Sequence, residues 1–299
     1  MSLRTATCPP SPSQAESDKR ARLGQSRRLV VVIPTYNERE NIALLVPAIE
    51  RELCRLPYES HILVVDDNSP DGTAQEVRAL ARVYTRLRLE TGPRLGLGAA
   101  YVRGLRYALE NLHADIVIQM DADFSHKVED VPRLLASLES GYDVVIGSRY
   151  VSGGSIEGDW SLFRKWQSSA ANLLVRFVCG MRDVRDCTAG FRAIRGDVLR
   201  RMDVARLTAQ GYSFQIQLLH EAFKQGATIC EVPTQFVDRV RGETKLGTSL
   251  RERLDFVLHS CAIRVDKGWP FKLTAVVASG VAFNLVLLLA LVRWIDFPR

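Results

Sequence analysis

Two aspartates separated by one small residue follow an apolar run near the middle of the chain. The run I-V-I-Q-M begins at Ile116 and leads directly to Asp121, Ala122 and Asp123. Alternate side chains of a strand share a face, so both carboxylates are expected on one side, with Ala122 leaving room for a bulky ligand. Carboxylate oxygens are preferred ligands of Mg²⁺ and Mn²⁺. The pattern predicts a two-acid cation site or, alternatively, a solvated turn at a strand end, where Asp is common.

The elements that must position these aspartates alternate between strand and helix. Strand-like runs cover residues 29–34, 60–66 and 86–91 and begin again at 116, and helical patterns cover 41–56, 73–82, 99–112 and 128–140. This alternation predicts an α/β fold, Rossmann-like, with a mostly parallel sheet and helices on both faces. Ligands of such sheets bind at the carboxyl ends of the strands. We therefore expect Pro34–Glu38 and Asp66–Asp67, which end the first two strands, to lie near Asp121.

The positive charge of the chain is concentrated near its N-terminus. The net charge is +6, and residues 1–28 hold six basic against two acidic residues, so they carry +4 of it. The remainder is nearly neutral, and its charge gives no support for a nucleic-acid partner. We expect residues 1–28 to be a disordered basic tail. The six cysteines lack paired C-x-x-C spacing, so neither structural zinc nor a disulfide framework is expected, which favours a reducing compartment.

The C-terminal residues predict attachment to a membrane. Residues 273–292 are twenty residues without a charge, flanked by Lys272 and Arg293 and by nearby tryptophans. As a helix they would span the roughly 30 Å hydrocarbon core of a bilayer. We predict a transmembrane segment at 269–299, with a buried core helix as the alternative. Residues 249–268 have the spacing of an amphipathic helix, either lying on the bilayer surface or packed against the preceding domain.

Eight motifs between about Leu29 and Leu246 resemble one known family. They are similar to the inverting family 2 glycosyltransferases of GT-A fold and, within that family, to the polyprenol (dolichol) phosphate mannose synthases. The resemblance implies a GT-A catalytic domain over residues 29–248. The motifs are V-V-I-P-T-Y-N-E-R-E-N-I from Val31, V-V-D-D-N-S-P-D-G-T from Val64, G-L-G-A-A-Y-V-R-G-L from Gly96, D-A-D-F-S-H from Asp121, G-S-R-Y from Gly147, D-C-T-A-G-F-R from Asp186, G-Y-S-F-Q from Gly211 and V-D-R-V-R-G-E-T-K-L from Val237.

The resemblance implies transfer of mannose from GDP-mannose to a polyprenyl phosphate, with inversion at the anomeric carbon. An aromatic ring could stack on the donor, and carboxylates could accept hydrogen bonds from the base or the ribose. For Asp66 and Asp67 the alternative is an Asx turn before the next helix. The donor-binding residues implied are Pro34, Tyr36, Glu38, Val65, Asp66, Asp67, Asp121, Ala122, Arg239 and Lys245.

The resemblance also implies a metal site and a phosphate site. Asp121, Asp123 and Ser125 would hold Mg²⁺ or Mn²⁺ against the departing nucleoside diphosphate. His126 is expected to be a hydrogen-bonded support, with ligation the alternative. A lipid phosphate is already an anion, so the reaction needs cations rather than a general base. The catalytic set implied is Asp123, Arg149 and Arg164; the two arginines would receive the lipid phosphate, although Arg164 could equally be solvated.

The resemblance also implies a mobile loop and a location at the membrane, and it leaves alternative functions to be weighed. Arg239 and Lys245 would lie on a loop that closes over the donor, with Gly242 supplying backbone freedom. The site is expected at the membrane, facing the cytoplasm where nucleotide sugars are supplied. One alternative is transfer of a glucosyl or aminoarabinosyl group from a UDP donor to the same kind of lipid. A non-catalytic membrane scaffold is disfavoured because the acidic and basic residues are intact, and a processive synthase because no Q-x-x-R-W motif occurs.

One departure from the polyprenol phosphate mannose synthases is visible. Where they carry F-Q-x-E, this chain has F-Q-I-Q at residues 214–217. The sequence leaves open whether a carboxylate at that position matters for recognition of the sugar.

Overall fold

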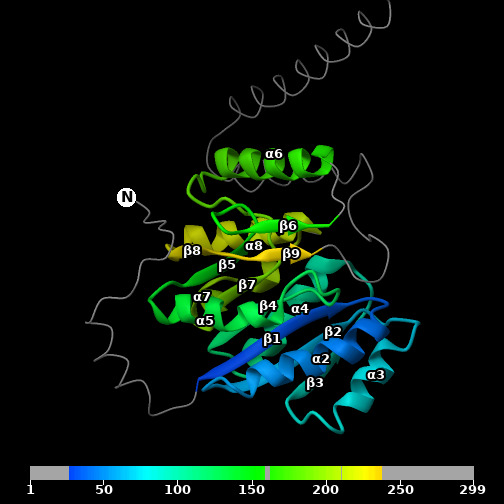
Figure 1. Cartoon of the computed structure of the whole chain (residues 1–299). Helices are drawn as coiled ribbons and strands as arrows, with labels where there is room; N and C mark the ends of the chain where they lie inside the picture. The colour runs from blue at the N-terminus through cyan, green and yellow to red at the C-terminus, as the bar shows by residue number, and fades with distance from the viewer. Residues whose placement is uncertain (1–26, 159–161, 210, 238–299) are drawn as a thin grey trace, which may run out of the picture.

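The computed structural model describes residues 27–158, 162–209 and 211–237 (Figure 1). Residues 1–26 of the predicted N-terminal tail, the amphipathic helix and the transmembrane segment lie outside these residues, as do Arg239 and Lys245. The predicted end of the tail at residue 28 is wrong, because Arg28 begins β1 and Arg27 forms an ion pair with Glu139. Among the helices that the structure describes, none combines the length and the apolar character needed to cross a bilayer.

A seven-stranded sheet forms the centre of the molecule, in the order β3-β2-β1-β4-β7-β5-β8. Every strand is parallel to its neighbours except β7, which runs antiparallel between β4 and β5. The strands are β1 (Arg28–Thr35), β2 (Glu59–Asp66), β3 (Leu87–Thr91), β4 (Ile116–Gln119), β5 (Val144–Ser148), β7 (Arg192–Arg195) and β8 (Ile229–Pro233). A separate pair joins β6 (Ser155–Glu157) to β9 (Gln235–Val237).

Helices cover both faces of this sheet (Figure 1). One face packs against α2 (Arg39–Leu53), α3 (Thr73–Leu80) and α5 (Val131–Glu139). The other packs against α4 (Leu97–Glu110), α6 (Leu162–Val178), α7 (Gly196–Arg201) and α8 (Tyr212–Lys224). Two short 3-10 helices, Val128–Asp130 and Val204–Arg206, complete the set. The predicted α/β fold with a mostly parallel sheet is therefore confirmed, and the predicted element boundaries differ by only a few residues.

The first strand shows why the sequence forms a sheet that is buried on both sides. Val30 and Val32 face the core on the α4 side, whereas Val31 and Ile33 face the α2 side, and all four are fully buried. Continuous apolar, β-branched runs are typical of parallel strands covered by helices on both faces. Gly104 lets α4 approach closely, since a Cβ there would lie 2.6 Å from Cγ1 of Val32.

The strand order locates the part of the sheet where a ligand can bind. From β1 the chain moves outward to β2 and β3, and then returns to place β4 on the opposite side of β1. The order reverses between β1 and β4, and the loops that follow these two strands diverge. Such a reversal opens a crevice at the carboxyl ends of the strands. The segments that begin at Tyr36 and at Met120 border this position.

Candidate functional site at the carboxyl edge of the sheet

The loops after β1 and β2 are tied together through Asp66. Its side chain is fully buried and accepts a hydrogen bond from Thr35 Oγ1 over 3.0 Å. It also accepts from the backbone N–H of Ser69, over 2.9 Å, and from its hydroxyl. Glu38 N donates to Thr73 Oγ1 at 3.0 Å, which ties the two loops a second time. The hydrogen bond from Ser69 spans three residues, one more than the Asx turn expected as the alternative, and the Asp66 carboxylate shapes the rim of the site.

Asp67, the next residue, has a different environment. Its side chain is buried and its Oδ1 accepts from Arg103 Nη2 of α4 over 2.6 Å. Burial raises the pKa of the Asp67 carboxyl above its ordinary value, even though the hydrogen bond and the charge of Arg103 act in the opposite direction. Arg103 takes Oδ1 of Asp67. The other carboxylate oxygen, Oδ2, is suited to accept a hydrogen bond from an N–H group of a ligand.

Two other predicted donor residues lie on the loop after β1. The guanidinium of Arg94 lies 3.8 Å above the Tyr36 ring, and its Nη1 donates to the Tyr36 hydroxyl over 3.0 Å. Glu38 accepts from Asn41 Nδ2 at 2.6 Å. Pro34 and Val65, by contrast, are buried partners in the register of β1 and β2. They therefore position the loops from within the sheet.

The acidic pair lies beyond its strand, because β4 ends at Gln119. The expectation that a strand carries Asp121 and Asp123 is therefore wrong, so strand alternation does not decide how their side chains lie; Phe124, which follows them, has φ 62°. The Asp121 side chain is 35% exposed, whereas Asp123 is buried. Asp123 accepts from the Ser125 N–H over 3.1 Å. A loop, rather than a strand, presents the two carboxylates, with Ala122 buried between them.

His126 supports the loop that carries the acids. Its Nδ1 accepts from the backbone N–H of Asp121 over 3.2 Å, and its ring stacks on Phe191 with 5.0 Å between centroids. Gly190 leaves space for this arrangement, since a Cβ there would lie 3.3 Å from Oδ2 of Asp121. Tyr101, fully buried on α4, donates its hydroxyl to Oδ1 of Asp121 over 3.3 Å. The expected role of His126 as a hydrogen-bonded support agrees with this geometry.

The oxygen atoms around Asp123 suit a cation that arrives with its ligand. Within the described residues there is no group of three or more His, Cys, Asp and Glu side chains that could enclose a metal. There are two carboxylates, and the buried Ser125 Oγ finds no hydrogen-bond partner in the part of the chain that the structure describes. Magnesium is usually held by one or two carboxylates together with substrate phosphates. Asp121, Asp123 and Ser125 fit that pattern.

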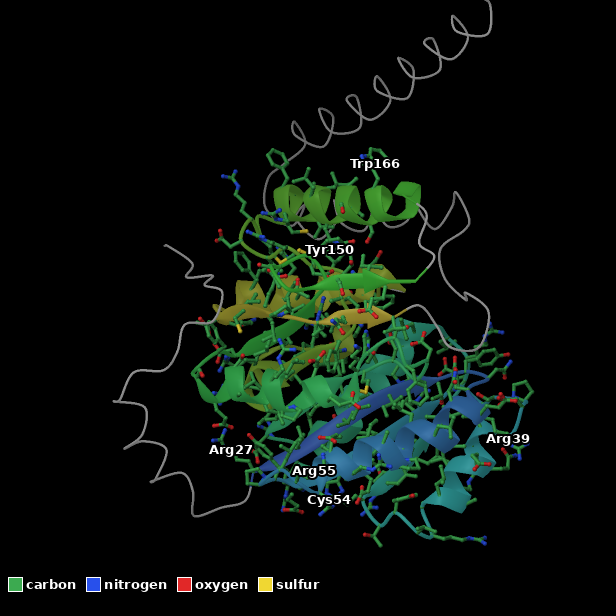
Figure 2. The ribbon with its side chains drawn as sticks, viewed as in Figure 1. Arg27, Arg39, Cys54, Arg55, Tyr150 and Trp166 are labelled. Carbon is green, nitrogen blue, oxygen red and sulfur yellow. The ribbon has the colours of Figure 1, made fainter. Side chains whose placement is uncertain are left out.

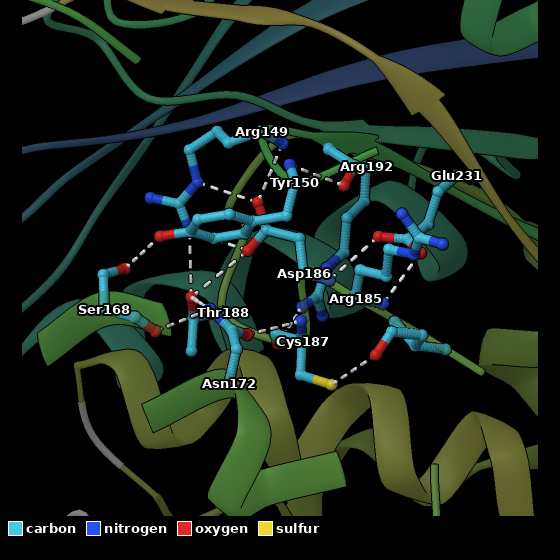
Figure 3. A network of polar contacts seen from close by, with 12 residues as sticks. Arg149, Tyr150, Ser168, Asn172, Arg185, Asp186, Cys187, Thr188, Arg192 and Glu231 are labelled. Atoms are coloured by element: carbon cyan, nitrogen blue, oxygen red, sulfur yellow. Dashed lines mark hydrogen bonds and ion pairs between the residues drawn. The ribbon is translucent and has the colours of Figure 1, made fainter. Parts of the chain in front are cut away.

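A second polar centre surrounds Arg149, immediately after β5 (Figure 3). Arg149 Nε and Nη2 donate to the two carboxylate oxygens of Asp186, over 2.7 Å each. Nη2 also donates to Thr188 Oγ1 at 2.9 Å. Burial alone would raise the pKa of Asp186, but the charge of Arg149 and its hydrogen bonds hold that pKa below the ordinary value. The guanidinium plane of Arg149 is therefore fixed.

Residues from two other elements hold this centre in place (Figure 3). Glu231 on β8 accepts from the backbone N–H groups of Arg185 and Asp186, over 2.8 Å each. Burial raises the pKa of Glu231. Asn172 on α6 accepts from Cys187 N over 2.8 Å. These contacts connect β5, β8 and α6 around one cation.

Phe236 connects the acidic and the basic centres. Its ring lies 5.4 Å from the Arg149 guanidinium carbon and 6.1 Å, edge to face, from the His126 ring. Arg149 and the loop of Asp121 therefore border the same aromatic side chain. Arg164 belongs to α6, but its side chain lies outside the described part of the structure.

Sequence reasoning did not identify Arg192 as a site-shaping residue. This fully buried side chain on β7 donates to the carbonyl oxygens of Gln215 and Cys187, over 2.6 and 2.7 Å. Burial lowers the pKa of Arg192 to about 10. The available signals were its place at the end of the motif D-C-T-A-G-F-R and the apolar run A-I that follows it.

Gln217, which stands where the polyprenol phosphate mannose synthases carry Glu, has a structural role. Its Oε1 accepts from the Ala209 N–H over 3.0 Å.

Solved structures share the fold of this chain. Glucosyl-3-phosphoglycerate synthase from Mycobacterium tuberculosis, in complex with Mn²⁺, UDP-glucose and phosphoglyceric acid, superposes with a TM-score of 0.61 and 23% identity. The match covers 88% of this chain and 89% of that one. The same enzyme with phosphoglyceric acid alone gives the same TM-score. This likeness shows a GT-A-like α/β fold.

Sequence comparison identifies closer relatives. A polyprenol monophosphomannose synthase of Mycolicibacterium smegmatis is 39% identical over 247 residues, covering 81% of this chain and 89% of the relative. An undecaprenyl-phosphate mannosyltransferase of Micrococcus luteus is 40% identical over 222 residues, covering 74% and 88%. The model of the glycosyl transferase family 2 matches residues 30–203. The chain is therefore a member of glycosyl transferase family 2.

Proposed function

We propose that this chain transfers a mannosyl group from GDP-mannose to a polyprenyl phosphate, with inversion at the anomeric carbon. The names of the two relatives support the mannosyl group and the lipid phosphate. The observation that carries the proposal is that Phe236 contacts both His126, which supports the acidic loop, and Arg149, whose guanidinium is fixed. The acidic loop would bind the cation of the donor diphosphate, and the arginine would bind the anionic acceptor.

The donor would lie across the carboxyl ends of β1, β2 and β4. Tyr36 offers a ring for stacking, and Glu38 and Asp67 offer acceptors for N–H or hydroxyl groups. Asp121, Asp123 and Ser125 would hold Mg²⁺ or Mn²⁺. When bound, the cation supplies positive charge that neutralises the departing diphosphate. His126 and Tyr101 keep Asp121 in place for this role.

The acceptor would be a phosphate monoester of a lipid. One of its oxygens forms a bond to the anomeric carbon as the bond from that carbon to the diphosphate breaks, and the electron pair leaves with GDP. No proton needs to be removed, so the work of the protein is positioning and electrostatic. Arg149 is proposed to position the phosphate, and Asp186, which accepts from its Nε and Nη2, would fix the orientation of the guanidinium. Arg164, Arg239 and Lys245 are proposed partners on grounds of family resemblance.

Exposed apolar side chains on the outer side of α6 are consistent with a lipid acceptor. Trp166, Leu173 and Phe177 are 59%, 63% and 61% exposed, and Figure 2 shows Trp166 on the side of α6 away from the sheet. The inner side of the same helix contacts the Arg149 centre: Ser168 Oγ accepts from the Tyr150 hydroxyl over 2.7 Å. An apolar surface thus adjoins the proposed phosphate site. We propose that residues 249–299 attach the protein to the membrane and that the site faces the cytoplasm.

A transfer assay with two donors tests this function. The full chain is incubated with polyprenyl phosphate vesicles, Mn²⁺ and radiolabelled GDP-mannose or UDP-glucose, and label is measured in the organic phase. We expect lipid-linked label from GDP-mannose, lost in Asp123→Ala and retained in the surface control Asp197→Asn. Label from UDP-glucose alone would replace the donor assignment with the UDP-sugar alternative. If the transferred sugar were found only in a water-soluble product, the assignment of a lipid acceptor would be overturned.

A further inference from the structure

The ion pair between Arg103 and Asp67 is shielded from solvent at the rim of the site. Arg103 Nη2 lies 2.6 Å from Asp67 Oδ1, and the two side chains are 19% and 7% exposed. Water and salt screen such a pair much less than an exposed one. Arg103 reaches this carboxylate from α4, across the end of the sheet. The contact therefore restrains a side chain that the proposed function assigns to the donor.

Gly92, just after β3, provides the space for this contact. A Cβ on Gly92 would lie 2.5 Å from Arg103 Nη1 and 2.6 Å from its Cζ, so the guanidinium packs directly against the glycine backbone. The Gly92 N–H donates to the Asp66 carbonyl over 3.0 Å, which fixes the glycine beside β2. A side chain at position 92 would force the Arg103 guanidinium to shift from this position.

Arg103 holds this position although one of its donors is unsatisfied. Its Nε is buried and has no hydrogen-bond partner in the described part of the chain. A buried N–H without a partner is unfavourable for folding. Arg103 therefore keeps its contact with Asp67 while one of its own donors stays unpaired. The effect of this arrangement is to restrain the Asp67 side chain.

Arg103 also affects the pKa of the Asp67 carboxyl. Burial and the neighbouring Asp66 raise the pKa of Asp67, whereas Arg103 and Arg94 lower it. Loss of Arg103 would remove a hydrogen bond and a charge that oppose burial, so this pKa would rise further. The proportion of Asp67 able to act purely as an acceptor would then fall at mildly acidic pH.

We propose that Arg103 is a positioning residue for the donor base: it holds the Asp67 carboxylate where that group accepts from a ring N–H. The inference rests on the proposed nucleotide-sugar donor. Guanine N1 and uracil N3 carry a hydrogen, whereas adenine N1 and cytosine N3 are lone-pair acceptors that a carboxylate repels. The pair therefore selects guanine or uracil against adenine or cytosine.

Calorimetric titration of the full chain with nucleotides in Mn²⁺, from pH 5.5 to pH 8, tests this role. Wild type should bind GDP or UDP at least tenfold more tightly than ADP and CDP. Arg103→Met and Gly92→Ala should each weaken the binding of GDP about tenfold at pH 7, with a larger loss at lower pH. Arg103→Lys should restore part of it. The matched control is Arg106→Met, which removes an exposed arginine paired with Glu110 on the same helix, and should bind as wild type.

The outcomes separate this inference from the proposed function. Wild-type affinity and pH dependence in Arg103→Met and Gly92→Ala would overturn the positioning role alone. So would an equal loss at every pH that Arg103→Lys does not restore, since that describes a structural defect. If wild type binds no nucleoside diphosphate, the proposed function fails as well. Thermal unfolding establishes that each variant is folded; should Arg103→Met not fold, Gly92→Ala and Arg103→Lys decide the result.

Discussion

Asp186 accepts from Nε and Nη2 of Arg149, over 2.7 Å each, and is itself fully buried. A carboxylate on one loop thus fixes the plane of a guanidinium on another. In the proposed reaction this geometry determines where the lipid phosphate is received. The pair is therefore a point at which stability and catalysis can be measured together.

Asp186→Asn should impair use of the lipid acceptor without impairing donor binding. We expect kcat/KM for polyprenyl phosphate to fall at least tenfold, while the Kd for GDP with Mn²⁺ stays within twofold. Breaking one partner of a buried ion pair costs about 3 kcal/mol of unfolding free energy. Asp197→Asn removes an exposed pair with Arg201 and should cost under about 1 kcal/mol. Equal losses in the two variants would contradict the structural part of this account.

The same residue predicts part of the acid dependence of stability. The folded-state pKa of Asp186 lies below the ordinary value of 3.8, because Arg149 outweighs the effect of burial. The stabilisation it supplies is complete above about pH 4 and is lost as the pH falls towards the folded-state pKa. Urea unfolding of wild type between pH 5 and pH 2.5 should therefore show a steeper decline than Asp186→Asn. Parallel curves would show that this carboxyl does not titrate as the geometry implies.

The elements that the sequence predicted well are those with an uninterrupted pattern. The β-branched run of β1 and the helical spacing of α2 are local signals, and the rule for open sheets placed Tyr36, Asp67 and Asp121 at one edge. The acid pair was assigned to a strand because apolar residues continue to Met120. The chain instead leaves the sheet after Gln119, since Asp123 bonds to the next turn and Phe124 adopts φ 62°.

What the sequence did not reveal depends on pairings between distant residues. Asp186 lies 37 positions from Arg149, and nothing in either motif indicates that they form one ion pair. Arg192 is placed by β7, a four-residue strand inserted antiparallel between two parallel ones. Arg103 reads as an ordinary solvated helix residue until the space above Gly92 is known. These contacts are tertiary, so periodicity cannot predict them.

Gly104→Ala should destabilise the protein even though Ala favours helices. A Cβ at position 104 would lie 2.6 Å from Val32 Cγ1 and 2.7 Å from Val65 Cγ2, both in the core. Overpacking costs about 1–3 kcal/mol and outweighs a helix-propensity gain of about 1 kcal/mol. Chemical denaturation should show a net loss of about 1 kcal/mol. Combining it with Val65→Ala should cost less than the two single losses added together; strict additivity would contradict direct contact.

Thiol reactivity provides an independent check of the packing. Cys54 is exposed, whereas Cys179, Cys187 and Cys230 are buried. Burial also raises the pKa of Cys187, which keeps it protonated. In a Cys8→Ser, Cys261→Ser background, Ellman's reagent should modify one thiol rapidly and the other three only after denaturant is added. Rapid modification of more than one thiol in the native protein would contradict the core described above.

In the proposed reaction, the loop of Asp121 and Asp123 holds a cation against the donor diphosphate. The most direct measurement is anomalous diffraction at the manganese edge from crystals of the full chain soaked with GDP-mannose and Mn²⁺. We predict one anomalous peak within coordination distance of an Asp123 oxygen and of the diphosphate, with the base near Asp67. A nucleotide bound elsewhere, or manganese away from both aspartates, would contradict the account.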